Sequence, residues 1–384
     1  MTKILILTAG FGEGHNAAAR ALAAAFDATA GPGTAEVVDV FARAAPRFNA
    51  LARHSYLALI NRTPQLWNRI YHWVDRSDFV EKRYGLFRSE QRLLAQLLLH
   101  EPPDAVCSTF PICAFLLNRI AGAGGPVVPH YNIVTDSISI HSLWWRAPCQ
   151  GWFLPNQDSA DVLLKAGIDP LLVHILGFPV QALFSEQAGR IAPPDLGTGA
   201  TPRVLHIINS GTLHAPETAR RLLTETDWEI TCAVGRDERL RQQLTDVAAT
   251  RKAPATILGW TREIPRLLMT HHAVVSKAGG ATTQEAIAAH CPMIVSQVVP
   301  GQEEGNYELL RRHGAGVRAD TPDVVLSELR RAFADRGRVW RDWRSALVPL
   351  ARPEAASDIA RHVLAAIGPP STDTAPETAQ RSTA

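Results

Sequence analysis

Two glycine-rich turns, one near each end of the chain, constrain its fold more than any other feature. The first follows the apolar run Ile4–Thr8 and reads Ala9-Gly10-Phe11-Gly12-Glu13-Gly14-His15. The second follows Ala273–Ser276 and contains Gly279 and Gly280. At both places the apolar run predicts a buried strand, and the small residues after the glycines predict a helix. A strand, a glycine turn and a helix start together favour a bound anion, because backbone N–H groups and the helix dipole point at it.

The first turn departs from the fingerprint of dinucleotide-binding proteins. Gly10, Gly12 and Gly14 give G-x-G-x-G, and His15 stands where the third glycine of G-x-G-x-x-G belongs. Asp39, at the end of the next expected strand, suits such a fingerprint, so an NAD-dependent oxidoreductase stays an alternative that His15 disfavours. A histidine at a helix start can instead act as a general base near neutral pH.

Polar side chains follow the second turn closely. Thr282 and Thr283 add hydroxyl donors to the anion site, and Glu285 is expected in the first turn of a helix from Thr283 to Ala289. A carboxylate at that position can accept hydrogen bonds from a ribose diol. A phosphate site followed by an acceptor for a diol predicts nucleotide binding.

The length and composition favour a two-domain cytoplasmic protein. A chain of 384 residues exceeds the usual size of one domain, and a formal net charge of +2 gives no indication of nucleic-acid binding. The five cysteines include no C-x-x-C pair, which predicts reduced thiols and no zinc site. We expect no signal peptide, because the apolar run Ile4–Leu7 is short and leads into a glycine turn. No stretch reaches the roughly 18 apolar residues of a membrane span, so any membrane contact should be peripheral.

Strand and helix patterns alternate through both halves of the chain. This alternation predicts an α/β fold with two Rossmann-like domains, whose parallel sheets face a cleft. Ligands of such sheets bind at the carboxyl ends of the strands, so both glycine turns should line the cleft. The expected division is a first domain over residues 1–190, a linker over 191–202, a second domain over 203–345, a C-terminal helix over 346–367 and a disordered tail over 368–384.

Residues 47–92 interrupt the alternation and combine positive with aromatic side chains. The positive residues include Arg69, Arg76, Lys82 and Arg83, and Trp73 is one of the aromatic residues. Rings and cations in this combination suit the interface of an anionic membrane. The alternative is a group of helices packed on the sheet with a solvated basic face.

Several motifs together resemble those of the monogalactosyldiacylglycerol synthases and processive diacylglycerol glucosyltransferases of glycosyltransferase family 28. The resemblance extends from Ile4 to about Ala366. The similar segments are residues 7–18, Val134-Thr135-Asp136 with His141, Trp144 and Trp145, Gly177-Phe178-Pro179-Val180, Lys277–Ala286, Pro300–Asn306 and Gly314-Ala315-Gly316.

The resemblance implies the two-domain GT-B fold and a defined reaction. A hexose would pass from UDP-glucose or UDP-galactose to a diacylglycerol-like lipid, with inversion at the anomeric carbon. The first domain would bind the acceptor and an anionic membrane surface, and the second would bind the nucleotide sugar. The sequence contains no D-x-D pair, so we expect a metal-independent enzyme without a cofactor. It would lie peripherally on the inner face of the cell membrane.

The resemblance also implies roles for single residues. His15 is the expected base, with Asp136 as its rival. The acceptor-side residues are Gly12 and Gly14, which shape the turn, and His141 and Trp144, for which buried aromatic packing is the favoured alternative. On the donor side, the diphosphate would be bound by Gly279, Gly280, Thr282 and Thr283, the ribose by Glu285, and the hexose by Gln302 and Glu303. Trp260 would flank the uracil, although core packing explains this residue equally well.

Two further functions stay open. One is an enzyme that adds N-acetylglucosamine to a lipid-linked peptidoglycan precursor, which has a similar second domain. The segment Phe11–His15 and the tryptophan-rich region favour the diacylglycerol branch. The other is a non-catalytic nucleotide-sugar-binding protein, against which the presence of both His15 and Glu285 argues.

Overall fold

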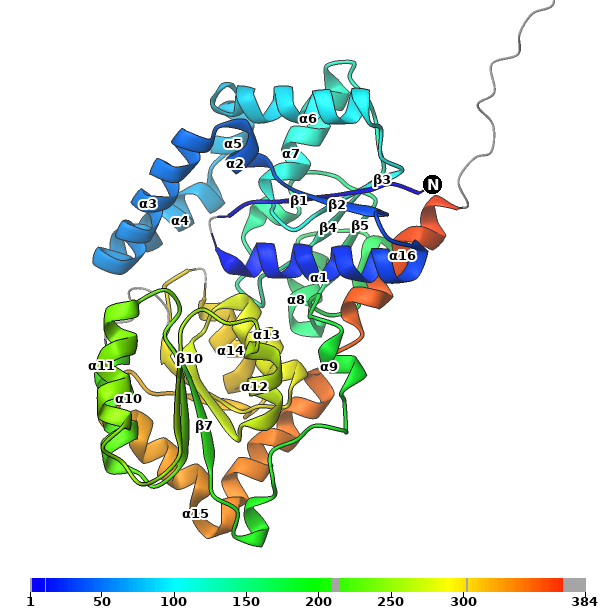
Figure 1. Cartoon of the computed structure of the whole chain (residues 1–384). Helices are drawn as coiled ribbons and strands as arrows, with labels where there is room; N and C mark the ends of the chain where they lie inside the picture. The colour runs from blue at the N-terminus through cyan, green and yellow to red at the C-terminus, as the bar shows by residue number, and fades with distance from the viewer. Residues whose placement is uncertain (1, 11, 209–213, 302, 369–384) are drawn as a thin grey trace, which may run out of the picture.

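The chain forms two parallel six-stranded sheets, one in each half, as the alternating pattern predicts (Figure 1). The structure is a computed structural model, which describes residues 2–10, 12–208, 214–301 and 303–368. Each sheet carries helices on both faces, which cover the apolar and almost fully buried central strands such as β1 (Ile4–Thr8), β3 (Ala105–Ser108) and β10 (Ala273–Lys277). The fold prediction of two Rossmann-like domains is therefore confirmed.

The first sheet has the order β2-β1-β3-β4-β5-β6, with every neighbouring pair parallel. The direction of strand addition reverses between β1 and β3, and ligands of open α/β sheets bind beyond the strand ends at such a point. Its strands are β1 (Ile4–Thr8), β2 (Ala35–Asp39), β3 (Ala105–Ser108), β4 (His130–Ile133), β5 (Gly151–Leu154) and β6 (Val173–Ile175). Its helices are α1 (Glu13–Ala30), α2 (Val40–Ala44), α3 (Pro46–Arg62), α4 (Pro64–Arg76), α5 (Phe79–Lys82), α6 (Arg88–His100), α7 (Ile112–Gly122) and α8 (Gln157–Lys165). The short helix α9 (Leu183–Glu186) follows and packs against α12 (Ile264–Thr270) of the second domain.

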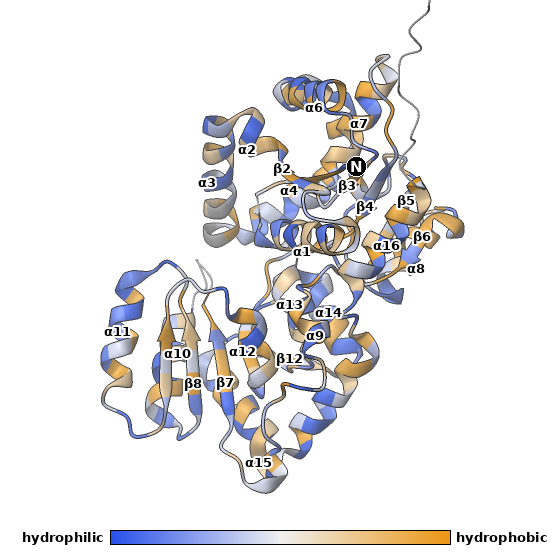
Figure 2. Cartoon of the chain, turned by 45° about the vertical axis from the view of Figure 1, so that its right-hand side comes forward, coloured by the Kyte–Doolittle hydropathy of each residue, from blue (hydrophilic) through white to orange (hydrophobic). Residues whose placement is uncertain are grey.

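The second sheet has the order β12-β11-β10-β7-β8-β9 and reverses between β7 and β10. Figure 2 shows hydrophobic residues gathered on its strands, whereas α11 and α15 also carry hydrophilic residues. Its strands are β7 (Arg203–Ile207), β8 (Glu229–Ala233), β9 (Ala255–Leu258), β10 (Ala273–Lys277), β11 (Met293–Gln297) and β12 (Gly316–Arg318). The later helices are α10 (Ala215–Glu225), α11 (Glu238–Ala248), α12 (Ile264–Thr270), α13 (Gly280–Ala288), α14 (Glu304–Arg312), α15 (Pro322–Leu347) and α16 (Ala355–Ile367).

The last helix of the chain returns to the first domain. Helix α16 packs along α1 (Figure 1), and its residues Ile359, Ala360 and Val363 are fully buried in one core with Ile4 and Phe26. The expected C-terminal helix over 346–367 is thus corrected, because α15 reaches residue 347 and α16 begins only at 355. The two domains are consequently joined by two chain crossings. The expected disordered tail lies, apart from residue 368, outside the described residues.

The two domains touch through glycine at one tight contact. A Cβ placed on Gly305, at the start of α14, would lie 1.7 Å from the carbonyl oxygen of Ser137 in the first domain. No larger residue fits there, because heavy atoms without a bond between them do not approach so closely. Beside this contact, Gln284 Nε2 donates to Ser137 Oγ at 3.0 Å.

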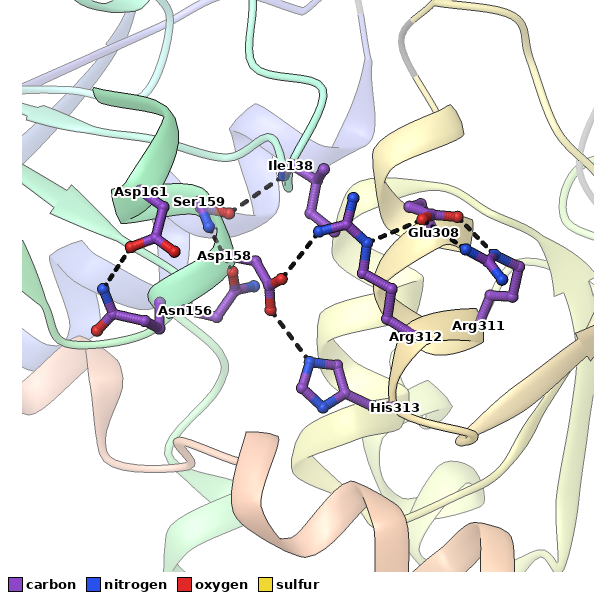
Figure 3. Close-up of polar contacts among 10 residues, drawn as sticks. Ile138, Asn156, Asp158, Ser159, Asp161, Glu308, Arg311, Arg312 and His313 are labelled. Carbon is purple, nitrogen blue, oxygen red and sulfur yellow. Dashed lines mark hydrogen bonds and ion pairs between the residues drawn. The ribbon is translucent and has the colours of Figure 1, made fainter. Parts of the chain in front are cut away.

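An ionic bridge joins the domains on the other side of α14 (Figure 3). Asp158 in α8 accepts from Arg312 Nη1 at 3.1 Å and lies 3.1 Å from His313 Nε2. Glu308 holds the Arg312 guanidinium from the opposite side, with Nε 2.8 Å from its Oε1. Helix α14 is therefore fastened to the first domain along its whole length.

Candidate functional site

His15 lies at the strand reversal of the first sheet, where the sequence predicts a ligand site. It is the third residue of α1, and its side chain is buried. Its Nδ1 atom is 2.7 Å from the carbonyl oxygen of Thr109, which follows β3, and 2.9 Å from Thr135 Oγ1, which follows β4. A carbonyl oxygen only accepts, so this network assigns the hydrogen to Nδ1 and the lone pair to Nε2.

Burial also determines the charge of His15. It lowers the pKa of the imidazole to about 4, against the smaller opposing effect of the Thr109 hydrogen bond. The ring is therefore neutral near pH 7 and can accept a proton at Nε2. The Phe110 ring meets it edge-on, with centroids 5.2 Å apart, and fixes its orientation.

Asp136, the rival base, follows the end of β4 by three residues and contacts Trp144. Its Oδ2 atom accepts from Trp144 Nε1 at 2.7 Å. Burial raises the pKa of this carboxyl to about 6, although the Trp144 hydrogen bond acts in the opposite direction. The indole also stands near His15, with ring centroids 6.4 Å apart, so both candidate bases gather around one tryptophan.

Trp144 and His141 are both buried and held by contacts within the first domain. Trp144 is fully buried, and its indole N–H is taken by Asp136. His141 is buried as well, with its ring edge-on to Tyr71 of α4 at 4.8 Å and its Nδ1 accepting from Leu143 N at 3.2 Å. Both side chains are packed in the interior, which agrees with the alternative of buried aromatic packing, and acceptor contact stays a prediction.

Helix α13 begins at Gly280, with Gly279 as its N-cap, which is three residues earlier than expected. Its first hydrogen bond runs from Thr283 N to Gly279 O at 2.9 Å, so the amides before it have no acceptor within the helix. Glu285 consequently lies in the second turn, which corrects its predicted place in the first. Thr283 also departs from prediction, because its side chain is fully buried and its hydroxyl faces Met293 Sδ at 3.9 Å. Thr282 is partly exposed in the first turn, and its contact with the diphosphate stays a prediction.

Glu285 is partly buried, and its surroundings favour the neutral form. Burial raises the pKa of this carboxyl to about 7, and the positive charge of Arg20 in α1 opposes the rise only in part. A buried carboxyl group with a strongly raised pKa is typical of functional sites. Its predicted contact with ribose stays a prediction.

The two glycine turns face each other across the domain boundary. A Cβ built on Gly14 would lie 3.7 Å from the amide nitrogen of Ala281, and one built on Gly280 would lie 3.2 Å from the carbonyl oxygen of Thr135. Gly12 is the N-cap of α1 and has open space around it. The two turns therefore meet at one interface, and the expectation that they line a ligand cleft stays a prediction.

The residues expected at the hexose and the uracil differ in their exposure and in their contacts. Glu303 is buried; Lys277 Nζ pairs with its Oε1, and Val299 N donates to its Oε2 at 3.1 Å. Both carboxylate oxygens are therefore already engaged, which argues against its predicted role at the sugar hydroxyls. Trp260 is 61% exposed beneath the guanidinium of Arg262, so the core-packing alternative is wrong. Gln302 lies outside the described residues.

Three groups at this interface carry no role in the sequence prediction. They are the Thr109 carbonyl, the Lys277 ammonium and the Asn306 side chain, whose Nδ2 donates to Ala278 O at 2.9 Å. Among the described residues no partner reaches Asn306 Oδ1, which is buried beside Gly280. Lys277 and Asn306 belong to the motifs on which the resemblance rests, so the sequence could have indicated them as site residues. No sequence pattern indicates the role of the Thr109 carbonyl, because every residue has a backbone carbonyl.

A cavity of about 280 Å³ opens between the α3–α4 turn and the carboxyl ends of β11 and β12. Ile60 and Pro64 line it from the first domain. Ser296 and Gln297 line it from the second, and their Oγ and Oε1 atoms are buried without a partner in the described part of the chain. Unpartnered acceptors beside aliphatic surface suit a hydroxylated ligand.

Helix α4 presents different faces to the interface and to solvent. Leu66, Ile70 and Trp73, spaced by four and three residues, form an exposed stripe that we call the α4 apolar stripe. On the opposite face, a Cβ on Gly301 would lie 2.9 Å from Tyr71 Cδ1, so α4 rests on the loop after β11. In the described ranges, no helix is both long and apolar enough to cross a bilayer.

Known proteins match the chain in sequence and in fold. Residues 15–180 match the family model of monogalactosyldiacylglycerol (MGDG) synthase. A processive diacylglycerol beta-glucosyltransferase of Bacillus cereus (strain AH820) is 26% identical over 373 residues, which are 94% of this chain and 93% of that protein. The protein of the same name from Bacillus pumilus (strain SAFR-032) is 24% identical over 344 residues, or 88% of each chain.

A solved structure supports the architecture. The S. aureus MnaA structure with UDP superposes with a TM-score of 0.61 at 13% identity, over 94% of this chain and 96% of that one. At this identity the likeness is evidence for the fold alone. Two Rossmann-like domains with facing strand ends are the GT-B architecture. In sequence, the chain is thus similar to the monogalactosyldiacylglycerol synthases and to the processive diacylglycerol β-glucosyltransferases.

Proposed function

We propose that this protein is an inverting glycosyltransferase that moves a hexose from a UDP-sugar to diacylglycerol or a closely related lipid. The observation that carries the proposal is the meeting of two glycine-headed helix starts, with Gly14 of α1 against Ala281 of α13. The proposed anion site at the start of α13 thereby faces the turn that carries His15. In the proposed reaction, the base lies opposite the leaving diphosphate. The names of the relatives support diacylglycerol as the acceptor, and the UDP in the similar solved structure supports the donor.

The proposed chemistry uses one proton acceptor. The acceptor hydroxyl oxygen forms a bond to the anomeric carbon while the bond from that carbon to the UDP oxygen breaks and its electron pair leaves with UDP. Attack from the opposite face inverts the anomeric centre. The hydroxyl proton passes to His15 Nε2, and the Thr109 carbonyl, 2.7 Å from Nδ1, stabilises the positive ring. Asp136 is the alternative acceptor of this proton.

We further propose that the transfer needs no divalent metal. The sequence lacks a D-x-D pair, and the amides ahead of the first α13 hydrogen bond can offset the charge of the leaving diphosphate. Turnover should therefore survive incubation with EDTA. Complete loss of turnover in EDTA, with recovery in magnesium or manganese, would contradict this part of the proposal.

The acceptor is expected to arrive from a lipid surface beside α4. Leu66 and Trp73 are 49% and 56% exposed, and Arg69 and Arg76 flank them on the same helix. Apolar side chains between cations suit the headgroup region of an anionic leaflet. We propose peripheral association with the inner face of the cell membrane, because nucleotide sugars and reduced thiols belong to the cytoplasm.

The proposal is tested with liposomes that contain diacylglycerol and with a panel of UDP-sugars, followed by mass spectrometry of the lipids. A hexosyl-diacylglycerol formed from UDP-glucose or UDP-galactose is the expected product, and its anomeric configuration should be β. Transfer restricted to UDP-N-acetylglucosamine and a lipid-linked muramyl peptide would support the peptidoglycan alternative. UDP binding without turnover on any acceptor would support a binding protein.

A further inference from the structure

We propose that Lys277 is the cation of the donor site, whose ammonium exchanges its partner Glu303 for the diphosphate of the nucleotide sugar. The inference rests on the proposed function and adds a residue to the donor site. It also changes the role of Glu303, from a contact of the hexose to a resting partner of Lys277.

The Lys277 ammonium lies directly over the start of α13. Lys277 is the last residue of β10 and precedes the N-cap Gly279 by two positions. A Cβ built on Gly279 would lie 3.7 Å from Lys277 Cε and 3.8 Å from Lys277 Nζ. The positive side chain therefore stands beside the unpaired amides at the beginning of the helix, where an anion would bind.

A second positive end meets this place from the other domain. Helix α1 begins at Glu13, and its Gly14 approaches Ala281 of α13, so the two helix dipoles point their positive ends at each other. The first turn of α13, all of it described, contains no acidic residue, and Glu13 is turned toward Arg20 at 3.3 Å. Two positive helix ends and an ammonium at one interface repel one another unless a negative group lies between them.

Glu303 supplies that negative charge in this structure, since its Oε1 atom, like Lys277 Nζ, lies 3.8 Å from a Cβ built on Gly279. Its carboxylate is 7% exposed, whereas the Lys277 side chain is 28% exposed. A diphosphate entering from solvent can therefore reach Lys277 but not Glu303. When Lys277 turns to the diphosphate, Glu303 keeps its hydrogen bond from Val299 N at 3.1 Å and its place at the positive start of α14. The exchange thus leaves the carboxylate stabilised.

The experiment compares two ligands that differ only in phosphate. UDP and uridine are titrated calorimetrically into the full chain and into Lys277→Met, Lys277→Arg and Lys252→Met. Lys252 is an exposed lysine before β9 and serves as the matched control. Thermal unfolding of each variant verifies that it is folded. Hydrogen bonds to charged groups contribute about 1.5–3 kcal/mol, which corresponds to about a 10- to 100-fold change in affinity.

We expect Lys277→Met to weaken UDP binding by about 10- to 100-fold and uridine binding by less than about two-fold. Lys277→Arg should recover most of the UDP affinity, because it keeps the charge, and Lys252→Met should match the wild type. Equal losses for UDP and uridine, or an unchanged UDP affinity, would overturn the role of Lys277. If the wild type binds neither ligand, the proposed function itself fails, so the two failures are distinguishable.

Discussion

The Nδ1 atom of His15 is tied to the carbonyl oxygen of Thr109 at 2.7 Å, across the point where the first sheet reverses its direction. His15 follows β1 and Thr109 follows β3, so two neighbouring strand ends fix one imidazole. In serine hydrolases a buried carboxylate holds the base in this way. Here a backbone carbonyl does so, and the ring keeps its orientation without a charged partner.

The first prediction concerns His15→Ala. If His15 accepts the proton of the acceptor hydroxyl, kcat should fall by about 100- to 10,000-fold, the usual contribution of one general base. UDP affinity should change little, because the donor residues belong mainly to the second domain. The matched control is His100→Ala, at the exposed end of α6, which should keep the wild-type rate. A His15→Ala enzyme with most of its rate, beside an inactive Asp136→Asn enzyme, would make Asp136 the base.

The second prediction uses the pH profile to separate the two candidates. The sequence suggests a base that titrates near neutrality, but burial moves the pKa of His15 to about 4 and that of Asp136 to about 6. Each base is active when deprotonated, so kcat/KM should fall on the acid side near pH 4 for His15 or near pH 6 for Asp136.

Trp144→Phe provides the internal check of that assignment. The variant removes the hydrogen bond that lowers the pKa of Asp136, so a limb that belongs to Asp136 should move to higher pH. A limb that belongs to His15 should stay within about half a unit of its wild-type position, since Trp144 gives that ring no hydrogen bond.

The third prediction concerns Glu285. Glu285→Ala should weaken UDP binding by roughly 1–3 kcal/mol through lost hydrogen bonds to the ribose. Because burial raises the pKa of Glu285 to about 7, the accepting carboxylate forms only above that pH. Uridine, which has the ribose but no phosphate, should therefore bind the wild type more tightly at pH 8 than at pH 6. Wild-type UDP affinity in Glu285→Ala would remove this residue from the site.

The same residue predicts a change in stability. The folded chain holds the Glu285 proton up to about pH 7, whereas an unfolded glutamate releases it near pH 4.5, so stability falls as pH rises between these values. Glu285→Gln should abolish this loss. Its melting temperature should exceed that of the wild type at pH 8, and the difference should disappear at pH 4. If Glu285→Gln and the wild type had the same melting temperature at pH 8 as well as at pH 4, the pKa assigned to Glu285 would be contradicted.

The fourth prediction concerns the surface around the α4 apolar stripe. Replacing Arg69, Arg76, Lys82 and Arg83 by Gln should reduce co-sedimentation with anionic liposomes and leave UDP affinity intact. Wild-type binding should also fall with added salt, since exposed charges are screened over about 8–10 Å at physiological ionic strength. The matched control replaces four exposed arginines of the second domain by Gln: Arg239, Arg266, Arg330 and Arg338.

The outcome of that comparison separates the two interpretations of residues 47–92. Equal losses in the two quadruple variants would indicate a general charge effect. Unchanged co-sedimentation in the first variant would return this stretch to a solvated basic face. A loss confined to the first variant, together with a further loss in Trp73→Ser, would support docking by the α4 apolar stripe.

The sequence predicts β1 and β10 well because each is a short apolar run followed by a glycine turn. The strand β12 is missed because Gly316–Arg318 is too short to form a pattern. The start of α13 is misjudged because Gly279 and Gly280 read as loop residues, although they form the N-cap and the first helical position. In the site, His15 and Glu285 follow from motifs of neighbouring residues.

What the sequence does not reveal depends on contacts between distant segments. Thr283 looks like a phosphate ligand until the helix phase turns its hydroxyl toward Met293, ten positions away. Glu303 looks free until Lys277 and Val299 occupy its oxygens. The tautomer of His15 likewise depends on a carbonyl 94 positions away in the chain. Local patterns hold no information on such partners.

The return of α16 to α1 has a consequence for synthesis in the cell. Helix α16, which completes the first core, is made after the whole second domain, so a nascent chain on the ribosome leaves the apolar face of α1 uncovered until Ile367 has emerged. The N-terminal domain therefore cannot mature before its C-terminal neighbour, which reverses the usual order of vectorial folding. Truncation or a bulky fusion before Ala355 should leave that face open to chaperones, even though every residue of the proposed donor site is present.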